Sequence, residues 1–157
     1  MTVISLKNSK YYIRAALVSL LLVFIISLIV GGARVPAFSG NTSAQRGYIE
    51  IYREFLYSFG WETDETPAEI SQILIPYEFN DTYEQYNEIQ LSQGFDLTLY
   101  KGKAAVKYVF SVINYPGMSA DGSVRATLLT YNGNIIGGDI CSIQIDGFMH
   151  GFIFDNG

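Results

Sequence analysis

The pattern of apolar and polar positions divides the chain into one long apolar run and a remainder of shorter, periodic segments. The run covers residues 15–33 and contains no charged residue. As a helix it would be about 28 Å long, close to the ~30 Å hydrocarbon core of a bilayer. Its apolar residues would face every direction, which argues against a core helix of a globular domain. We therefore predict that residues 15–33 form a transmembrane helix in the lipid bilayer.

The charges around this run predict its orientation. Three basic residues, Lys7, Lys10 and Arg14, precede the run, Arg34 follows it, and all 15 acidic residues lie beyond it. Basic residues favour the cytoplasmic side, so residues 1–14 should be cytoplasmic and the rest extracytoplasmic, at the cell membrane. Six basic and 15 acidic residues follow Arg34, a charge of −9 against −5 for the whole chain. This acidic part lacks the positive surface that nucleic acid requires, so we expect no nucleic-acid partner.

A cleaved signal peptide is the alternative, because the small residues near positions 31–37 suit a peptidase. Cleavage would yield a secreted binding protein. The apolar run is longer than the usual signal core of about 7 to 15 residues, which favours a retained anchor. Residues 34–42 contain Pro, Gly, Ser and Asn without periodicity and are predicted to be a linker. Fully extended, the linker reaches about 30 Å, so the domain should lie near the membrane surface.

Residues 43–157 are predicted to form a single domain. A first helix should run from Thr42 or Ser43 to Gly60, because its aromatic and apolar residues recur every three or four positions. The acidic residues 62–69 should be a loop, and residues 70–75 a short strand. A second helix is predicted over residues 80–92, with an exposed face rich in acidic and amide side chains and Gly94 as its stop.

The rest of this domain has strand character. Apolar residues alternate along residues 104–115, with Val106, Tyr108, Phe110 and Val112 on one face, and further strands are predicted over residues 124–131 and 135–145. Residues 116–122 should be a loop. Asn132-Gly133 is a hairpin signal, and Gly137-Gly138 suggests a bulge or a close backbone approach. The expected fold is α+β: helix, strand, helix, then three antiparallel strands, with two helices packed on one face of the sheet.

Seven short segments together resemble a known bacterial family. They are FGW at 59–61, IPYEF at 75–79, QGFDL at 93–97, YKGK at 100–103, NYPG at 114–117, IGGDICS at 136–142 and DGFMHGF at 146–152. Residues 46–152 resemble the family called domain of unknown function 4830, found in anaerobic Gram-positive species. The resemblance implies an N-terminal membrane segment followed by a small domain. It supplies no established activity, cofactor or catalytic residue.

Motifs for known chemistry are missing from the sequence. The phosphate-binding loop, the nucleophile elbow and the H-E-x-x-H and C-x-x-C metal motifs do not occur. With one histidine and one cysteine, a structural zinc site within a monomer is excluded. We therefore expect no metal and no cofactor. The lone cysteine also excludes an intramolecular disulfide, so the domain must be stable through its core.

One group of residues carries candidate chemistry. Asp139, Cys141, Asp146 and His150 lie within 12 positions and offer a carboxylate, a thiol and an imidazole. In a regular strand Asp139 and Cys141 share one face, and a nearby carboxylate raises a thiol pKa, which opposes nucleophilic activation. The structural interpretation makes Cys141 a packed core residue and His150 a hydrogen-bonded residue on the segment that crosses back over the sheet.

The leading functional hypothesis is a non-catalytic binding module for a protein or cell-envelope partner. In it, Asp139, His150 and nearby tyrosines form a small polar ligand pocket, with Cys141 beside them. The chain's 12 tyrosines supply rigid amphipathic contact area for such recognition. The alternative is a hydrolase-like enzyme of the cell envelope that uses Asp139, Cys141 and His150.

Overall fold

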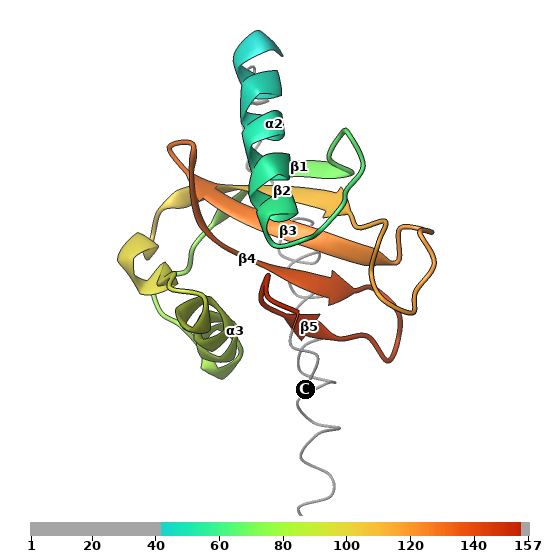
Figure 1. Cartoon of the computed structure of the whole chain (residues 1–157). Helices are drawn as coiled ribbons and strands as arrows, with labels where there is room; N and C mark the ends of the chain where they lie inside the picture. The colour runs from blue at the N-terminus through green and yellow to red at the C-terminus, as the bar shows by residue number, and fades with distance from the viewer. Residues whose placement is uncertain (1–41, 155–157) are drawn as a thin grey trace, which may run out of the picture.

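The computed structural model describes residues 42–154, which form two helices on a five-stranded antiparallel sheet (Figure 1). The elements in chain order are α2 (Thr42–Ser58), β1 (Glu69–Leu74), α3 (Asp81–Ser92), the 3-10 helix η2 (Leu97–Tyr100), β2 (Ala104–Ser111), β3 (Val124–Tyr131), β4 (Asn134–Ser142) and β5 (Met149–His150). The strands lie in sequence order, so each pairs with its successor. The predicted α+β class is confirmed.

Local sequence signals set several element ends, and the helix predicted over residues 80–92 is found as α3. Asn80 caps α3, because its side chain accepts a hydrogen bond from the backbone N–H of Tyr83 at 2.9 Å. The β3–β4 hairpin turns at Asn132 and Gly133, whose φ angles are 51° and 81°. These two left-handed residues are what a type I′ turn requires, and asparagine and glycine tolerate them best.

Three predicted boundaries are wrong. The strand predicted over residues 104–115 ends at Ser111, after which Val112 forms only an isolated bridge with Thr63. The last long strand ends at Ser142 rather than at residue 145, because the chain turns there and returns as β5. The acidic residues 62–69 are not a free loop throughout: Thr63 forms a bridge with Val112, and the N–H of Asp64 donates to the carbonyl of Ser111 at 3.1 Å. Backbone pairing with β2 thus extends into a segment whose composition indicated only a solvated loop.

The two helices cover opposite faces of the sheet, which corrects the expectation that both lie on one face. The Tyr52 ring of α2 packs edge-on against Tyr108 at 4.8 Å, on the face that carries Leu128. Tyr86 of α3 instead bonds to Asp139, which lies opposite Thr127, one residue from Leu128 and therefore on the other face. Figure 1 shows α2 crossing in front of the sheet and α3 at the lower left, past the edge formed by β4.

The core is correspondingly divided in two. The cluster beneath α2 contains Tyr52, Leu56, Trp61, Tyr108, Phe110, Val112, Val124, Ala126, Leu128, Ile140 and Phe152. The cluster beneath α3 contains Ile73, Ile75, Tyr83, Tyr86, Leu97, Ala105, Leu129 and Ile136. The predicted alternation along β2 is confirmed. The predicted bulge is confirmed as well, because the β3–β4 register shifts between Leu129 and Thr130, opposite Ile136.

The membrane prediction falls on another part of the chain. Within residues 42–154, none of the helices has both the length and the apolar character needed to cross a bilayer. The predicted span of residues 15–33 and the linker up to residue 41 lie outside the described residues.

We predict that Gly138→Ala destabilises the fold. A Cβ at this position would lie 2.1 Å from the carbonyl oxygen of Thr127 and 2.6 Å from the Phe152 ring, and neither neighbour is free to move. Overpacking of this kind costs about 3 kcal/mol of unfolding free energy. Urea denaturation followed by Trp61 fluorescence measures the loss.

Gly47→Ala is the matched control, because Gly47 lies in α2 and a Cβ there meets none of the described residues within 4 Å. This change should stabilise the protein by about 0.5 to 1 kcal/mol. Equal effects of the two substitutions would contradict the close approach at Gly138.

Candidate functional site

Asp139 and Cys141 lie side by side on one face of β4, as predicted. Both are buried, with Asp139 3% exposed. The Tyr86 hydroxyl, from α3, donates a hydrogen bond to Oδ2 of Asp139 at 2.8 Å. Among the described residues Oδ1 has no partner of normal hydrogen-bond geometry, although the nearby Cys141 thiol offers a weak donor. The three side chains form a buried polar group that connects α3 to β4.

Burial controls the protonation of this group. It raises the pKa of Asp139 to about 6, against the opposing effects of the Tyr86 hydroxyl, the Cys141 thiol and the charge of Lys107. It also raises the pKa of the Cys141 thiol, and the adjacent Asp139 carboxylate raises that pKa further. Cys141 is therefore a protonated thiol at neutral pH, which is the wrong state for a nucleophile.

His150 lies on the other face of the sheet. It pairs with Ile140 across β4 and β5, and successive residues of a strand point to opposite faces, so Asp139 points away from it. The structure thus brings Asp139 and Cys141 together but separates both from His150. Asp146 lies elsewhere again, exposed in the turn between β4 and β5. The four candidate residues therefore do not line a single pocket.

Both ring nitrogens of His150 are occupied. Nδ1 lies 2.6 Å from the carbonyl oxygen of Gly151, and Nε2 lies 3.1 Å from the Tyr115 hydroxyl. A carbonyl oxygen only accepts, so Nδ1 carries the hydrogen and Nε2 accepts from Tyr115. Partial burial lowers the pKa of His150, which favours this neutral form. The imidazole therefore has no nitrogen available to act as a general base.

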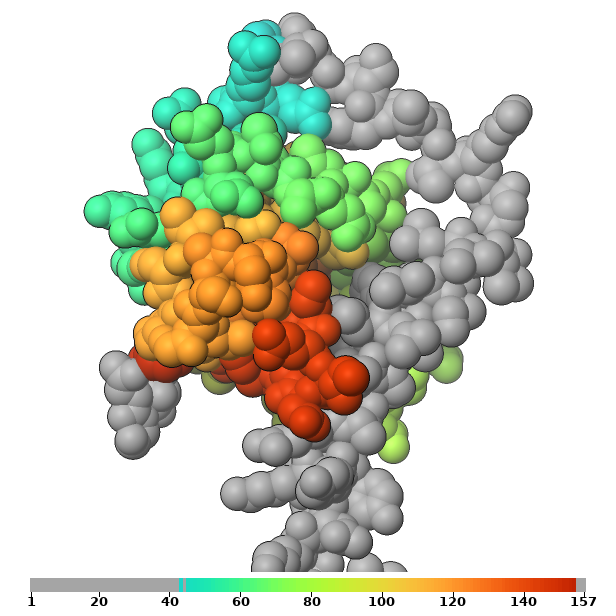
Figure 2. All heavy atoms as spheres, turned by 90° about the vertical axis from the view of Figure 1, so that its right-hand side faces the viewer, coloured from blue at the N-terminus to red at the C-terminus, as the bar shows by residue number. Residues whose placement is uncertain are grey.

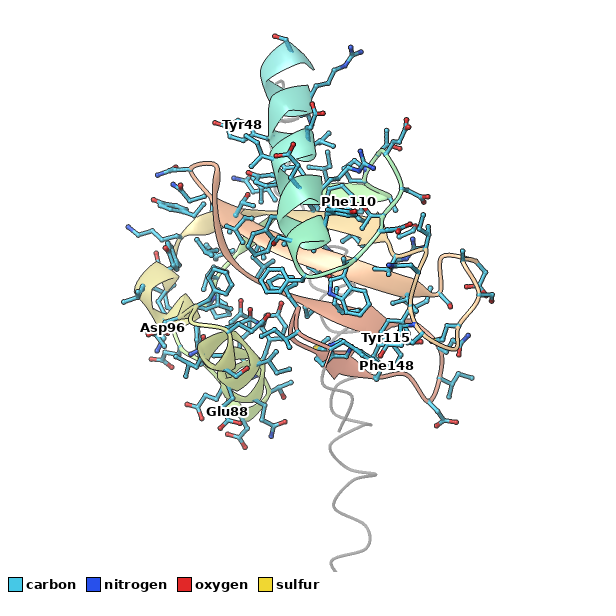
Figure 3. The ribbon with its side chains drawn as sticks, viewed as in Figure 1. Tyr48, Glu88, Asp96, Phe110, Tyr115 and Phe148 are labelled. Atoms are coloured by element: carbon cyan, nitrogen blue, oxygen red, sulfur yellow. The ribbon has the colours of Figure 1, made fainter. Side chains whose placement is uncertain are left out.

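Four other rings surround His150 and form the His150 cluster: Trp61, Tyr115, Phe148 and Phe154, together with His150 itself. Tyr115 stacks on Trp61 at 5.5 Å and on Phe148 at 4.5 Å between ring centroids. Figure 3 shows Tyr115 and Phe148 next to each other at one end of the sheet. All but Trp61 are partly exposed. The cluster thus presents stacked rings with polar atoms at a half-open surface.

Segments far apart in the sequence meet at this end of the sheet. The N–H of Ile113 donates to the carbonyl of Glu62, and the N–H of Ile143 donates to the carbonyl of Ser123. Figure 2 faces this end and shows the green, orange and red segments packed against one another. Backbone hydrogen bonds between the loops therefore hold the His150 cluster in place.

The sequence interpretation missed two glutamines of α3. The amide-rich composition of this helix indicates a solvated face, but Gln90 is fully buried, and its Oε1 accepts from the N–H of Gly138 at 2.7 Å. Gln93 Nε2 donates to the carbonyl of Gly138 at 3.1 Å, and its Oε1 accepts from the N–H of Phe152 at 2.6 Å. The available signal was spacing, since Gln90 follows Tyr86 by four positions and so shares its helix face.

Within residues 42–154, no group of three or more histidine, cysteine, aspartate or glutamate side chains is placed to hold a metal ion. Within these residues, the His150 cluster offers contact and hydrogen bonding, and Asp139 offers proton uptake.

Fold and site together define a small α+β domain with a half-open aromatic cluster at one end of its sheet. The family model described as Domain of unknown function (DUF4830) matches residues 55–140, more than half of the chain, and the chain belongs to this family. The match runs from α2 into β4, so it includes Asp139 and ends before Cys141 and His150. No curated protein and no solved structure matches the chain.

We predict that Asp139→Asn flattens the pH dependence of stability. The pKa of Asp139 is raised to about 6 in the folded protein, against about 3.9 in the unfolded chain. The folded state therefore binds this proton more tightly, and its contribution is fully present below about pH 4 and lost as pH rises through about 6. About 3 kcal/mol of unfolding free energy is at stake. Urea denaturation at intervals between pH 4 and pH 7.5 measures the slope for both proteins.

Asp146→Asn is the matched control, because Asp146 is an exposed carboxylate on the same hairpin. If the two variants change the slope equally, the buried Asp139 carboxyl is not the group responsible.

Proposed function

We propose that this chain is a single-pass membrane protein whose extracytoplasmic domain is a non-catalytic binding module for a protein or cell-envelope partner. One observation carries the proposal: the sole histidine and the sole cysteine of the chain lie on opposite faces of the sheet. A hydrolase using Asp139, Cys141 and His150 would need these groups within hydrogen-bonding reach of one another.

The His150 cluster supports a binding role. Stacked aromatic rings give rigid contact area at low conformational entropy, and the Tyr115 hydroxyl, which donates to His150, still offers a lone pair that accepts a hydrogen bond from a partner. The rings come from segments that backbone hydrogen bonds already fix, so little ordering is needed on binding. Recognition of a partner surface is therefore the use that this arrangement favours.

The proposed location depends on the first 34 residues. An uncharged run over residues 15–33, with three basic residues before it and every acidic residue after it, favours a retained anchor with a cytoplasmic N-terminus. The acidic remainder suits the outer side of the membrane. Cleavage near residues 31–37 would turn the same domain into a secreted binding protein.

We predict that Tyr57→Cys reacts with a membrane-impermeant maleimide in intact cells. Tyr57 is 69% exposed, so a thiol there should be reachable, whereas Cys141 is buried and gives no background before denaturation. Ser9→Cys, on the predicted cytoplasmic side, should react only after permeabilisation. Alkaline extraction of the same cells should leave the chain in the membrane fraction. Reaction of Tyr57→Cys only in permeabilised cells would reverse the topology, and release by alkali would favour the secreted form.

We predict that a photocrosslinking benzoylphenylalanine in place of Phe148 captures a discrete partner in living cells. The residue would lie within the His150 cluster and keep an aromatic ring there. The same crosslinker at Leu91, which is 53% exposed on α3, is the matched control and should give no such product. Electrophoresis of the crosslinked chain measures both. Equal products from both positions, or none from Phe148, would contradict binding through the cluster.

A further inference from the structure

A second exposed surface lies at the opposite end of the sheet. Three apolar side chains are largely exposed there: Leu74 by 58%, Tyr77 by 74% and Leu99 by 73%. Exposed Lys101 and Lys103 follow Leu99 in the chain. We call these five residues the tether-end patch. Apolar exposure of this kind, concentrated in neighbouring loops, marks an interaction surface.

Short contacts hold the segments of the patch together. Leu74 pairs with Ala104 at the end of β1, and the N–H of Ile75 donates to the carbonyl of Lys103 at 2.9 Å. The Tyr77 ring lies directly over Gly102, where a Cβ would approach it to 2.3 Å. These contacts place Leu74 and Tyr77 beside the loop that carries the two lysines.

The start of α2 lies at the same end of the sheet. The Tyr52 hydroxyl donates to the carbonyl of Gly133 at 3.0 Å, and a Cβ on Gly133 would lie 2.8 Å from the Tyr48 ring. Gly133 is in the β3–β4 turn, two residues after Tyr131, whose ring centroid lies 5.6 Å from that of Tyr100. Figure 1 shows this turn and the loop before β2 at the left of the sheet, with α2 rising above the sheet to their right. The chain that precedes α2 therefore joins the domain at the end that carries the patch.

We propose that the tether-end patch rests on the surface of the membrane in which the chain is anchored. The proposal depends on the anchoring proposed above. Nine linker residues span at most about 30 Å, so the beginning of α2 stays close to the lipid, and α2 reaches the patch end of the sheet through Tyr48 and Tyr52. Such tethering gives a high effective concentration, so a small and individually weak patch is sufficient for contact.

The chemistry of the patch fits a lipid surface. Leucine and tyrosine side chains partition into the interfacial region, and lysines extend their ammonium groups toward lipid phosphates. Lys101 already lies 4.5 Å from the centroid of the Phe79 ring, so its stem follows apolar surface. Glu78 and Asp96 lie in the same loops and offset the two lysines, so the apolar side chains carry most of the attraction.

Charge favours the same orientation. Residues 42–154 contain six basic and 14 acidic side chains, and two of the six basic ones belong to the patch. The rest of this part of the chain is therefore strongly negative, and an anionic lipid surface repels it. An anionic lipid surface therefore repels the patch less than it repels the rest of the domain.

The test uses the full chain in vesicles of phosphatidylcholine with about a quarter phosphatidylglycerol. Nitroxide labels are placed at Tyr77→Cys or Leu99→Cys in a Cys141→Ala background, and collision with a water-soluble nickel complex is measured. Ile145→Cys is the matched control, because Ile145 is 91% exposed in the β4–β5 turn at the other end of the sheet. Collision at positions 77 and 99 should be at least about threefold lower than at position 145. Fluorescence of buried Trp61 confirms that each labelled chain is folded.

The outcomes separate the two proposals. A chain that does not float with the vesicles overturns the anchoring, and the patch proposal falls with it. A chain that floats, with equal collision at positions 77, 99 and 145, overturns the patch proposal alone. Low collision with the nickel complex that persists in detergent micelles, together with spin–spin broadening between labels, would mean that the patch contacts a second copy of the chain. This result would also overturn membrane contact.

Discussion

The backbone of Gly138 is the point on which the arrangement of this domain depends. Strand β5 pairs with two residues of β4, so within residues 42–154 the edge of β4 at Gly138 has no neighbouring strand. Gln90 and Gln93 complete this edge from α3, with one amide accepting from the Gly138 N–H and the other donating to its carbonyl. Gln93 also accepts from Phe152, whose ring fills the core beneath α2. Two side chains thus fix a helix, a strand and the end of the domain relative to one another.

That same geometry separates the groups whose chemistry first attracts interest. With α3 held against β4, Tyr86 reaches Asp139 and the pair is sealed together with Cys141. The segment fixed through Phe152 places His150 on the far face, with its ring nitrogens taken by Tyr115 and Gly151. The acid and the thiol consequently lie on the face of the sheet beneath α3, whereas the imidazole lies on the face beneath α2, although the three groups are close in sequence. The carboxyl contributes a pH-dependent stability, and the imidazole contributes order to an aromatic surface.

The sequence predicts those parts of this structure that depend on local signals. The second helix, the Asn132-Gly133 turn and the alternation along β2 follow from the preferences of a few neighbouring residues, and all are found. The sides taken by the helices are not local, because each depends on how a loop crosses the sheet edge. Gln90 misleads for a related reason: its burial is compensated by a backbone edge that exists only after β4 has formed. Likewise, nothing in the spacing of Asp139 and His150 reveals that strand alternation divides them.

The two ends of the sheet have different characters, and this polarity relates the two proposed surfaces. At one end, where α2 begins, lie the tether-end patch and its lysines; at the other, the loops that follow β2 and β4 carry Tyr115 and Phe148. If the first end contacts lipid, the strands direct the His150 cluster away from the membrane. A partner would then meet the cluster without competing with the bilayer. A domain with its aromatic cluster beside the tether would instead present those rings to lipid, where interfacial aromatic residues are readily accommodated and lost to protein recognition.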